Sequence, residues 1–399
     1  MDIEKGRSNL NREPRIVFAS QRQYEVNDGY LLTVGPIGAE TGENYRELFP
    51  TMTVIGRKAI TSNATVKVPH QDFHLVKLDL KSPSLLVDFI SAVTGLFKLV
   101  GSCDGVIVRA GGLGSLVAII GFMRRKPVGI EVGGCVFNSL WHYGNFLGKL
   151  AAPVSYVLRC GLLRMADRVQ MVTQDYLQNR YFVSPKSTKC VGISNVSINR
   201  YGVCVLNDRK ARVLKGREVI LGSIGSFNGT FKAHDQAIKA CDYLNKNGYR
   251  VKLWIIGAGD KKPLNNLLKS LGLEDKVKLF DPVKPGKEIE KWLSNIDIYC
   301  QFSRREGISR ALIEAMNLGI PVVASNAGGT YELVDIRSLF EIDDVTVAAR
   351  NIEKLINDND FYSEMCSYSY YRTLQFEKES LISQRREFWA DFGIIKNEG

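Results

Sequence analysis

Short apolar runs alternate along most of this chain with longer segments in which apolar residues recur at helical spacing. Most runs end at a polar or glycine-rich turn, which is typical of a buried strand. The predicted strands are 15–20, 52–55, 74–78, 105–108, 128–132, 169–173, 189–193, 218–224, 252–256, 277–280, 296–301, 321–325 and 339–342. Helical segments such as 84–99, 113–123 and 345–356 lie between them. This alternation predicts an α/β protein whose parallel sheets are covered by helices.

The predicted elements form two groups, separated by a stretch without periodicity. A chain of 399 residues is long for one hydrophobic core, so two domains are expected. Residues 196–215 are polar and lack a repeating apolar pattern, which is typical of a linker. We therefore expect a flexible tail over 1–13, a first domain over 14–195, a second domain over 216–375 and a terminal segment over 376–399.

Two successive units of strand, glycine turn and helix fill the stretch 303–334. Gly307 follows the first strand, and Gly328-Gly329 follows the second. The carboxyl ends of neighbouring parallel strands lie at one edge of a sheet, where ligands commonly bind. Helix N-termini at that edge offer unpaired N–H groups to phosphates. The stretch therefore predicts a ligand site at the carboxyl edge of the second sheet.

Glu306 and Glu314 frame the first glycine turn, and the residues after them follow a known pattern. Glu306-x7-Glu314 with Ala315-Met316, Gly319, Pro321 and Gly328-Gly329 resembles the signature of the large retaining glycosyltransferase family with the GT-B fold, glycosyltransferase family 4. More narrowly, SRREGISRALIEAM is similar to bacterial members that build capsule, O-antigen or exopolysaccharide. The resemblance covers about residues 100–340.

This resemblance implies a fold, a reaction and a set of partners. The fold would be two Rossmann-like domains whose parallel sheets face a central cleft. A C-terminal helix, here within 378–392, would cross back to the first domain. The enzyme would be a retaining, metal-independent hexosyltransferase that uses a UDP- or GDP-sugar as donor and no cofactor. Its acceptor would be a lipid-linked saccharide in the synthesis of capsule or lipopolysaccharide.

The resemblance also implies roles for individual residues. Lys232 matches the lysine that grips the donor diphosphate, and Glu306 is expected to contact hydroxyls of the transferred sugar. Glu314 suits the ribose hydroxyls, because a carboxylate can accept two adjacent hydrogen bonds. The other donor-binding candidates are Gly307, Ile308, Ser226, Arg304, Arg310 and Gly257. Ser226 departs from the family's pattern, in which an arginine is common, so part of the phosphate clamp is missing or comes from Arg304, Arg305 or Arg310.

On the acceptor side, the sequence offers a glycine-rich loop after the first strand. Gly35 and Gly38 are the best matches to the family's loop, although the usual adjacent glycine pair is absent and a plain mobile loop remains an alternative. Gly133 closes another strand at the same edge, and His142 follows it. These four residues are the acceptor-side candidates.

No metal or dinucleotide cofactor is expected. Gly257-x-Gly259 imitates a dinucleotide fingerprint, but Lys262 occupies the position of the third glycine. Asp358-x-Asp360 imitates a metal-binding pair, but it lies in a polar turn between two predicted helices and is predicted to cap a helix.

The composition, with 45% hydrophobic and 24% charged residues, is that of a globular protein. Eight cysteines without paired spacing predict reduced thiols, and the polar start MDIEKGRSNLNREPR is unlike a signal peptide. We therefore expect a cytoplasmic protein.

The net charge of +11 is concentrated in the first half, where residues 1–200 hold 24 Lys and Arg against 15 Asp and Glu. Such a surface favours an anionic partner. The segment 138–163 combines Trp141, Phe146 and Leu147 with Lys149, Arg159 and Arg164. We expect it to dock on the inner face of the cytoplasmic membrane rather than on nucleic acid. The alternative is a helix whose apolar residues pack in the core.

Two other functions remain open. A GT-B sugar-nucleotide epimerase would need acid and base groups in the first domain, yet of the four histidines only His142 lies beside an edge glycine. A non-catalytic binding scaffold of a polysaccharide assembly complex would explain Ser226 and the irregular first loop.

Overall fold

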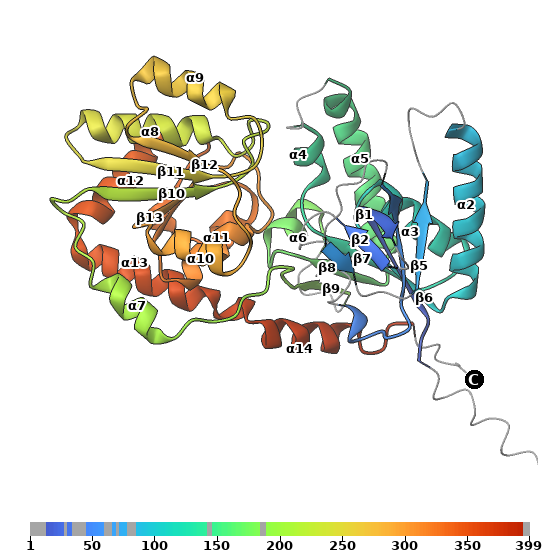
Figure 1. The fold of residues 1–399 in the computed structure, drawn as a ribbon. Helices are drawn as coiled ribbons and strands as arrows, with labels where there is room; N and C mark the ends of the chain where they lie inside the picture. Colours follow the sequence, from blue (N-terminus) through green and yellow to red (C-terminus); the bar gives the residue numbers. More distant parts are fainter. Residues whose placement is uncertain are drawn as a thin grey trace, which may run out of the picture.

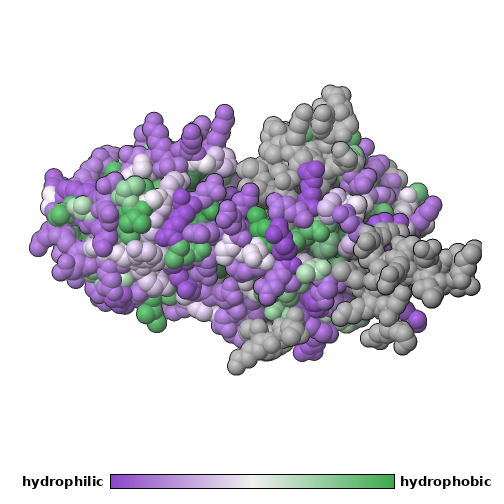
Figure 2. All heavy atoms as spheres, turned by 90° about the horizontal axis from the view of Figure 1, so that it is seen from below, coloured by the Kyte–Doolittle hydropathy of each residue, from purple (hydrophilic) through white to green (hydrophobic). Residues whose placement is uncertain are grey.

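The computed structural model describes residues 13–27, 30–33, 45–59, 66–68, 72–77, 85–141, 146–183 and 189–393. Gly35, Gly38 and His142 lie outside these residues. Figure 1 shows two lobes side by side, each built around a sheet with helices packed against it. The α/β class predicted from the sequence is confirmed. On the face seen in Figure 2, hydrophilic residues predominate and hydrophobic residues form only small patches.

The N-terminal lobe contains a sheet of nine strands within the described residues, with the main order β4-β2-β1-β6-β7-β8-β9; β3 also pairs with β1, and β5 pairs with β3. Its strands are β1 (Ile16–Asn27), β2 (Tyr30–Thr33), β3 (Thr53–Lys58), β4 (Val66–Val68), β5 (Phe73–Val76), β6 (Gly105–Arg109), β7 (Val128–Val132), β8 (Arg168–Met171) and β9 (Cys190–Gly192). Its helices are α2 (Leu85–Ser102), α3 (Gly112–Met123), α4 (Val136–Trp141), α5 (Phe146–Met165) and α6 (Tyr176–Arg180). The central strands β6 and β7 are apolar almost throughout because both faces of the sheet are covered.

The first strand is longer than predicted. The predicted strand ends at residue 20 with a glycine loop directly after it, whereas β1 continues to Asn27 and pairs with β2 in antiparallel fashion. The expected loop position is therefore wrong for 21–27. The sequence carries a hairpin signal here, since Asp28-Gly29 lies between the alternating Tyr24 and Val26 and the apolar run 30–32.

The C-terminal lobe contains a wholly parallel sheet in the order β12-β11-β10-β13-β14-β15. Its strands are β10 (Val219–Ile224), β11 (Val251–Ile256), β12 (Val277–Phe280), β13 (Ile298–Gln301), β14 (Val322–Ser325) and β15 (Leu339–Phe340). Its helices are α8 (His234–Lys246), α9 (Lys262–Leu271), α10 (Lys287–Ser294), α11 (Arg310–Asn317), α12 (Val345–Asn357) and α13 (Asn359–Arg372), with the short 3-10 helices η1 (Gly328–Glu332), η2 (Ile336–Ser338) and η3 (Thr373–Phe376). The side chain of Asp358 accepts a hydrogen bond from Phe361 N at the start of α13, so the predicted helix cap is confirmed.

The segment predicted as an irregular linker contains the helix α7 (Val203–Lys210). Its polar composition has a structural use, because Arg212 and Arg217 form ion pairs with the buried carboxylate of Asp297 at 2.9 and 2.7 Å. Arg209 donates to the backbone oxygen of Ile296. Arg209 and Arg212, within the predicted linker, and Arg217, just after it, therefore attach this segment to the C-terminal lobe.

The last helix, α14 (Lys378–Trp389), carries the chain back to the N-terminal lobe (Figure 1). Trp389 is buried and donates to Gln170 Oε1 at 3.0 Å, and its ring lies 5.8 Å from that of Tyr45. Arg385 donates to the backbone oxygen of Ser194. The end of the chain thus completes the core of the N-terminal lobe.

Candidate active site between the lobes

The centre of the site is an ion pair between Lys232 and Glu306. The Lys232 Nζ atom lies 2.5 Å from Glu306 Oε1, and Ser303 Oγ donates to the same oxygen at 2.7 Å. Only 18% and 12% of the two charged side chains are exposed. Among the described residues, both of these hydrogen bonds go to Oε1 and neither goes to Oε2.

These groups meet because β10 and β13 are parallel neighbours whose following loops leave the same edge of the sheet. Lys232 ends the loop after β10, and its stem packs over Gly225, where an added Cβ would lie 2.8 Å from Lys232 Cγ. Ala233 then adopts a left-handed conformation (φ 48°), an uncommon one for a residue with a Cβ. His234 follows this turn and starts α8.

His234 is buried, and its Nε2 lies 3.3 Å from the backbone oxygen of Gly225. Burial lowers the pKa of His234 to about 4. The imidazole is therefore neutral at physiological pH and adds no second positive charge next to Lys232. The sequence indicated no role for His234, which lies outside the stretch 303–334 that carries the resemblance, or for Ser303, which lies within it but follows no pattern of its own.

The glycine turns bring the two lobes into backbone contact. A Cβ added to Gly307 would lie 2.5 Å from the backbone oxygen of Gly133, which follows β7 in the N-terminal lobe. Gly328 has a positive φ of 61°, and a Cβ there would collide with the backbone oxygen of Glu306. Side chains at these positions would separate the loops, which explains why glycines occupy them.

Glu314 lies on α11, whose first turn is capped by Ser309 through a bond from Leu312 N. Arg310 lies one turn before Glu314, with 3.9 Å between Arg310 Nη1 and Glu314 Oε1. Ile308 packs against the cores of both lobes. The structure thus brings Glu314, Arg310 and Ile308 onto one short segment after the glycine turn.

The other predicted donor-site arginines have structural partners. Arg304 Nε donates to Asp343 at 2.8 Å, and this bond raises the pKa of Arg304. Arg305 donates to the backbone oxygen of Ser139 in the N-terminal lobe at 2.9 Å. Arg305 therefore bridges the lobes, and Arg304 fixes its own loop.

Ser226 and Gly257 lie on the neighbouring turns. The Ser226 hydroxyl donates to the backbone oxygen of Ala258 at 3.2 Å and accepts from Asn228 N at 3.1 Å, so it stabilises its loop. Gly257 packs so closely on Gly225 that a Cβ there would collide with the Gly225 backbone oxygen. In the part of the chain that the structure describes, no group of three or more His, Cys, Asp and Glu side chains is arranged to hold a metal ion.

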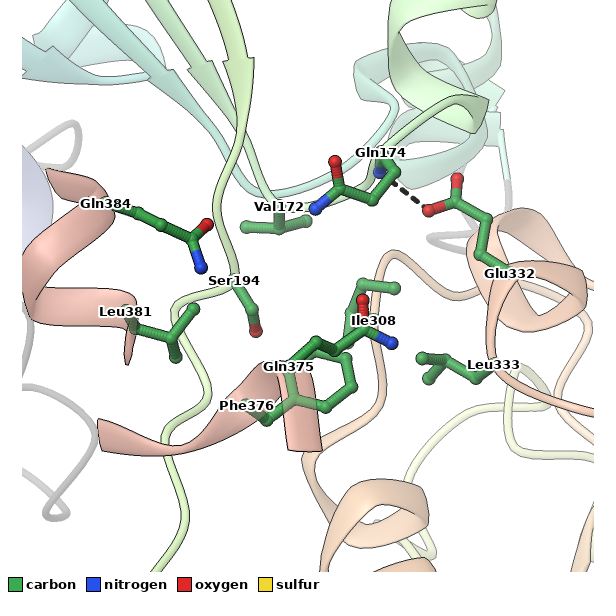
Figure 3. Close-up of a pocket in the computed structure, with 10 residues that line it drawn as sticks. All are labelled: Val172, Gln174, Ser194, Ile308, Glu332, Leu333, Gln375, Phe376, Leu381 and Gln384. Atoms are coloured by element: carbon green, nitrogen blue, oxygen red, sulfur yellow. Dashed lines mark hydrogen bonds between the residues drawn. The ribbon is translucent and has the colours of Figure 1, made fainter. Parts of the chain in front are cut away.

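Beside the glycine turns lies a small pocket of about 30 Å³ between the lobes. Figure 3 shows Val172 and Gln174 from the N-terminal lobe facing Ile308 and Glu332, with Gln384 on α14 at the other side. This volume holds about one water molecule. The lobes are therefore in close contact on this side.

Comparison with known proteins identifies relatives over most of the chain. Residues 205–372 match the protein family described as "Glycosyl transferases group 1". Protein CapJ of Staphylococcus aureus is 30% identical over 328 residues, which are 79% of this chain and 81% of CapJ. The O-antigen biosynthesis glycosyltransferase WclY of Escherichia coli is 35% identical over 207 residues, or 50% of this chain and 54% of that protein.

The solved structures similar to this one confirm the GT-B fold. The Anabaena protein HepE, in a complex with UDP and glucose, superposes with a TM-score of 0.68 at 16% identity, and the match covers 95% of this chain and 100% of HepE. Sucrose-phosphate synthase from Thermosynechococcus elongatus superposes with a TM-score of 0.70 at 16% identity, covering 95% of this chain and 98% of the synthase. At these identities the likeness concerns the fold alone.

Proposed function

This chain belongs to the glycosyl transferases group 1 family, and on that basis we propose that it transfers a hexose from a UDP- or GDP-sugar to a lipid-linked saccharide acceptor in bacterial surface polysaccharide synthesis. Retention of anomeric configuration and independence from metal ions are part of this proposal. The observation that carries it is the Lys232–Glu306 pair at the carboxyl edge of β10 and β13. The bound UDP and glucose named for HepE support the choice of donor.

The chemistry follows from the charges in the site. The leaving nucleoside diphosphate gains negative charge as the bond between its oxygen and the anomeric carbon of the sugar breaks. Fixed cations and N–H donors therefore stabilise the transition state more than the ground state. Lys232 and the backbone N–H groups of Gly307 and Ile308 would serve this purpose. Glu306 would bind hydroxyls of the transferred sugar, and Glu314 would bind the ribose.

Ser303 adds to the sequence-based assignment, because its hydroxyl and Lys232 hold the same oxygen of Glu306. A carboxylate fixed by two donors keeps one orientation when the substrate binds. We assign Ser303 to the positioning of Glu306.

The acceptor side of the proposal concerns α5. Its apolar residues at helical spacing point outward, and Phe146 and Leu147 are 73% and 74% exposed. The buried residues of α5 are Ala152, Arg159 and Leu163, so packing in the core, the alternative weighed for this segment, accounts for only one side of the helix. Arg159 was predicted to meet the membrane, which is wrong because its side chain is buried.

Among the described residues, α5 is the one helix whose length and apolar composition would allow it to cross a membrane. It also contains Pro153, and its buried face packs against the N-terminal lobe, which ties it to the protein. These features support a helix that lies in the membrane interface. We therefore propose a cytoplasmic protein held peripherally on the inner face of the membrane, where a lipid-linked acceptor is available.

The test is release of nucleoside diphosphate when the protein meets a panel of sugar nucleotides and membranes that contain acceptor. Lys232→Met should abolish release, whereas Lys246→Met, which removes an exposed lysine paired with Asp242 on the same lobe, should leave it unchanged. An epimerase would convert the sugar nucleotide without acceptor. A scaffold would bind it without turnover, and either result would contradict the proposal.

A further inference from the structure

Two loops of the C-terminal lobe, one after β10 and one after β13, are bound to each other beside the Lys232–Glu306 pair. The backbone nitrogen of Arg304 donates to the backbone oxygen of Phe231 at 2.8 Å. Phe231 directly precedes Lys232, and the Lys232 Nζ atom lies 5.8 Å from the centre of the Phe231 ring. The place of this ring therefore affects where the Lys232 ammonium group lies and how it meets Glu306.

Arg305 packs on the same ring. Its Cζ atom lies 5.0 Å from the centre of the Phe231 ring, which is within the range of a cation–π contact. Both side chains are half-buried, and such a contact gains strength when water is excluded from it. Arg305 Nη1 also donates to the backbone oxygen of Ser139 at 2.9 Å. One guanidinium thus contacts an aromatic ring of the C-terminal lobe and a backbone oxygen of the N-terminal lobe.

Ser139 belongs to the last turn of α4, the helix that follows β7 and Gly133. The backbone oxygens of a last helical turn have no donor within the helix, and an arginine side chain can cap one of them. Figure 1 shows α4 on the side of the N-terminal lobe that faces the other lobe. The bond from Arg305 to Ser139 requires α4 to lie against the loop of Arg305. It therefore depends on how the two lobes meet.

We propose that Arg305 is a positioning residue that couples the contact of α4 with the site to the orientation of Lys232, through the ring of Phe231. When α4 moves away, Arg305 loses its acceptor and no longer holds the ring in one place. Lys232 would keep its charge but lose its fixed position, and a leaving diphosphate is stabilised best by a cation that is already in position. This inference rests on the proposed function. It gives Arg305 a role different from that of the missing phosphate-clamp arginine.

The test uses Arg305→Lys, Phe231→Leu and the double variant. Arg305→Lys keeps the positive charge but loses the planar group that stacks on a ring. The control is Arg250→Lys, because Arg250 also donates to a backbone oxygen, that of Gly216, and lies just before β11 at the opposite edge of the same sheet. Calorimetry gives the affinity for UDP or GDP, and release of nucleoside diphosphate in the presence of acceptor membranes gives kcat.

We expect kcat to fall about tenfold in Arg305→Lys, with unchanged affinity for the nucleotide and no change of either quantity in Arg250→Lys. The double variant should be no slower than Phe231→Leu alone, because Arg305 acts through the ring. Weaker nucleotide binding in Arg305→Lys would make Arg305 a phosphate ligand, and an unchanged kcat would leave it without influence on Lys232. Either result would overturn the inference.

Hydrogen exchange of the backbone amides separates a failure of this inference from a failure of the proposed function. The amides of residues 226–232 and of α4 should exchange faster in Arg305→Lys than in the unmodified protein, and Arg250→Lys should leave them unchanged. If the unmodified protein turns over no sugar nucleotide, the proposed function fails. Faster exchange in both segments would then still support the link between α4 and the Lys232 loop, whereas unchanged exchange would refute it.

Discussion

Glu332, in the C-terminal lobe, accepts a hydrogen bond from the backbone nitrogen of Tyr176, in the N-terminal lobe, over 2.6 Å. The same carboxylate accepts from Gln174 N at 2.6 Å and from Asp175 N at 3.1 Å (Figure 3 shows the bond to Gln174). The side chain of Glu332, at the end of η1, therefore binds the backbone of the two residues before α6 and of the first residue of α6. Together with Gly307 against Gly133, it fixes how the lobes meet.

Removal of this carboxylate should loosen the contact between the lobes. Glu332→Ala leaves three N–H groups without their charged acceptor. We therefore expect the free energy of unfolding to fall by about 1.5–3 kcal/mol, the range for one hydrogen bond to a charged group. Thermal unfolding and limited proteolysis at the lobe boundary would measure it. Glu364→Ala is the control, because Glu364 pairs with Arg337 on the surface of the C-terminal lobe. Identical melting and cleavage in the two variants would contradict the role of Glu332.

Glu314→Ala should weaken nucleotide binding and leave the fold intact. The side chain is partly exposed near the glycine turn, and the loss of a hydrogen bond to a charged group is expected to cost about 1.5–3 kcal/mol. Calorimetric titration with the nucleoside diphosphate measures the change, with Glu379→Ala on α14 as control. Unchanged affinity in Glu314→Ala would remove this residue from the site.

Stability should depend on pH through His234. Its pKa is lowered by burial to about 4 in the folded protein from 6.5, so the unfolded chain binds more protons between these values. The free energy of unfolding is therefore unaffected by the titration of His234 above pH 6.5. It decreases as the pH falls from 6.5 toward 4, by up to about 3 kcal/mol. The free energy of unfolding, measured with denaturant at several pH values in this range, should change less steeply with pH in His234→Asn. Equal slopes in both proteins would show that the imidazole titrates normally.

Transfer should continue in excess chelator. The charge of the leaving diphosphate is expected to be met by Lys232 and by backbone N–H groups, which need no divalent ion. We expect the rate in EDTA to stay within about twofold of the untreated rate. Loss of activity in EDTA, reversed by magnesium or manganese, would contradict metal-independent transfer.

The sequence predicted those parts of the protein that local patterns determine. The strands 128–132 and 277–280 have the predicted bounds. The first is buried along its whole length, and the second, at the edge of its sheet, is short and mostly apolar. The glycine turn that contains Glu306 was found because its residues lie close together in the sequence.

What the sequence did not predict depends on contacts between distant residues. Tyr45 and Glu131 are 86 positions apart, and Tyr176 and Glu332 are 156 apart, so no local pattern connects them. Helix α7 was missed for a related reason: its Arg209 and the following Arg212 look solvated until Ile296 and Asp297 are placed beside them.

The outward face of α5 should bind anionic membranes. Residues 81–200 hold 14 Lys and Arg against 5 Asp and Glu, and each basic residue near an anionic surface contributes about 1 kcal/mol. Screening acts within about 8 Å at physiological salt, so co-sedimentation with anionic liposomes should fall steeply as salt rises. The double variant Phe146→Ser with Leu147→Ser should reduce binding, because these two exposed side chains can enter the headgroup region. Val213→Ser changes an exposed apolar residue outside the N-terminal lobe and should have no effect. Equal, negligible binding of the unmodified protein to neutral and anionic liposomes at low salt would refute the membrane proposal and favour a partner protein as the anchor.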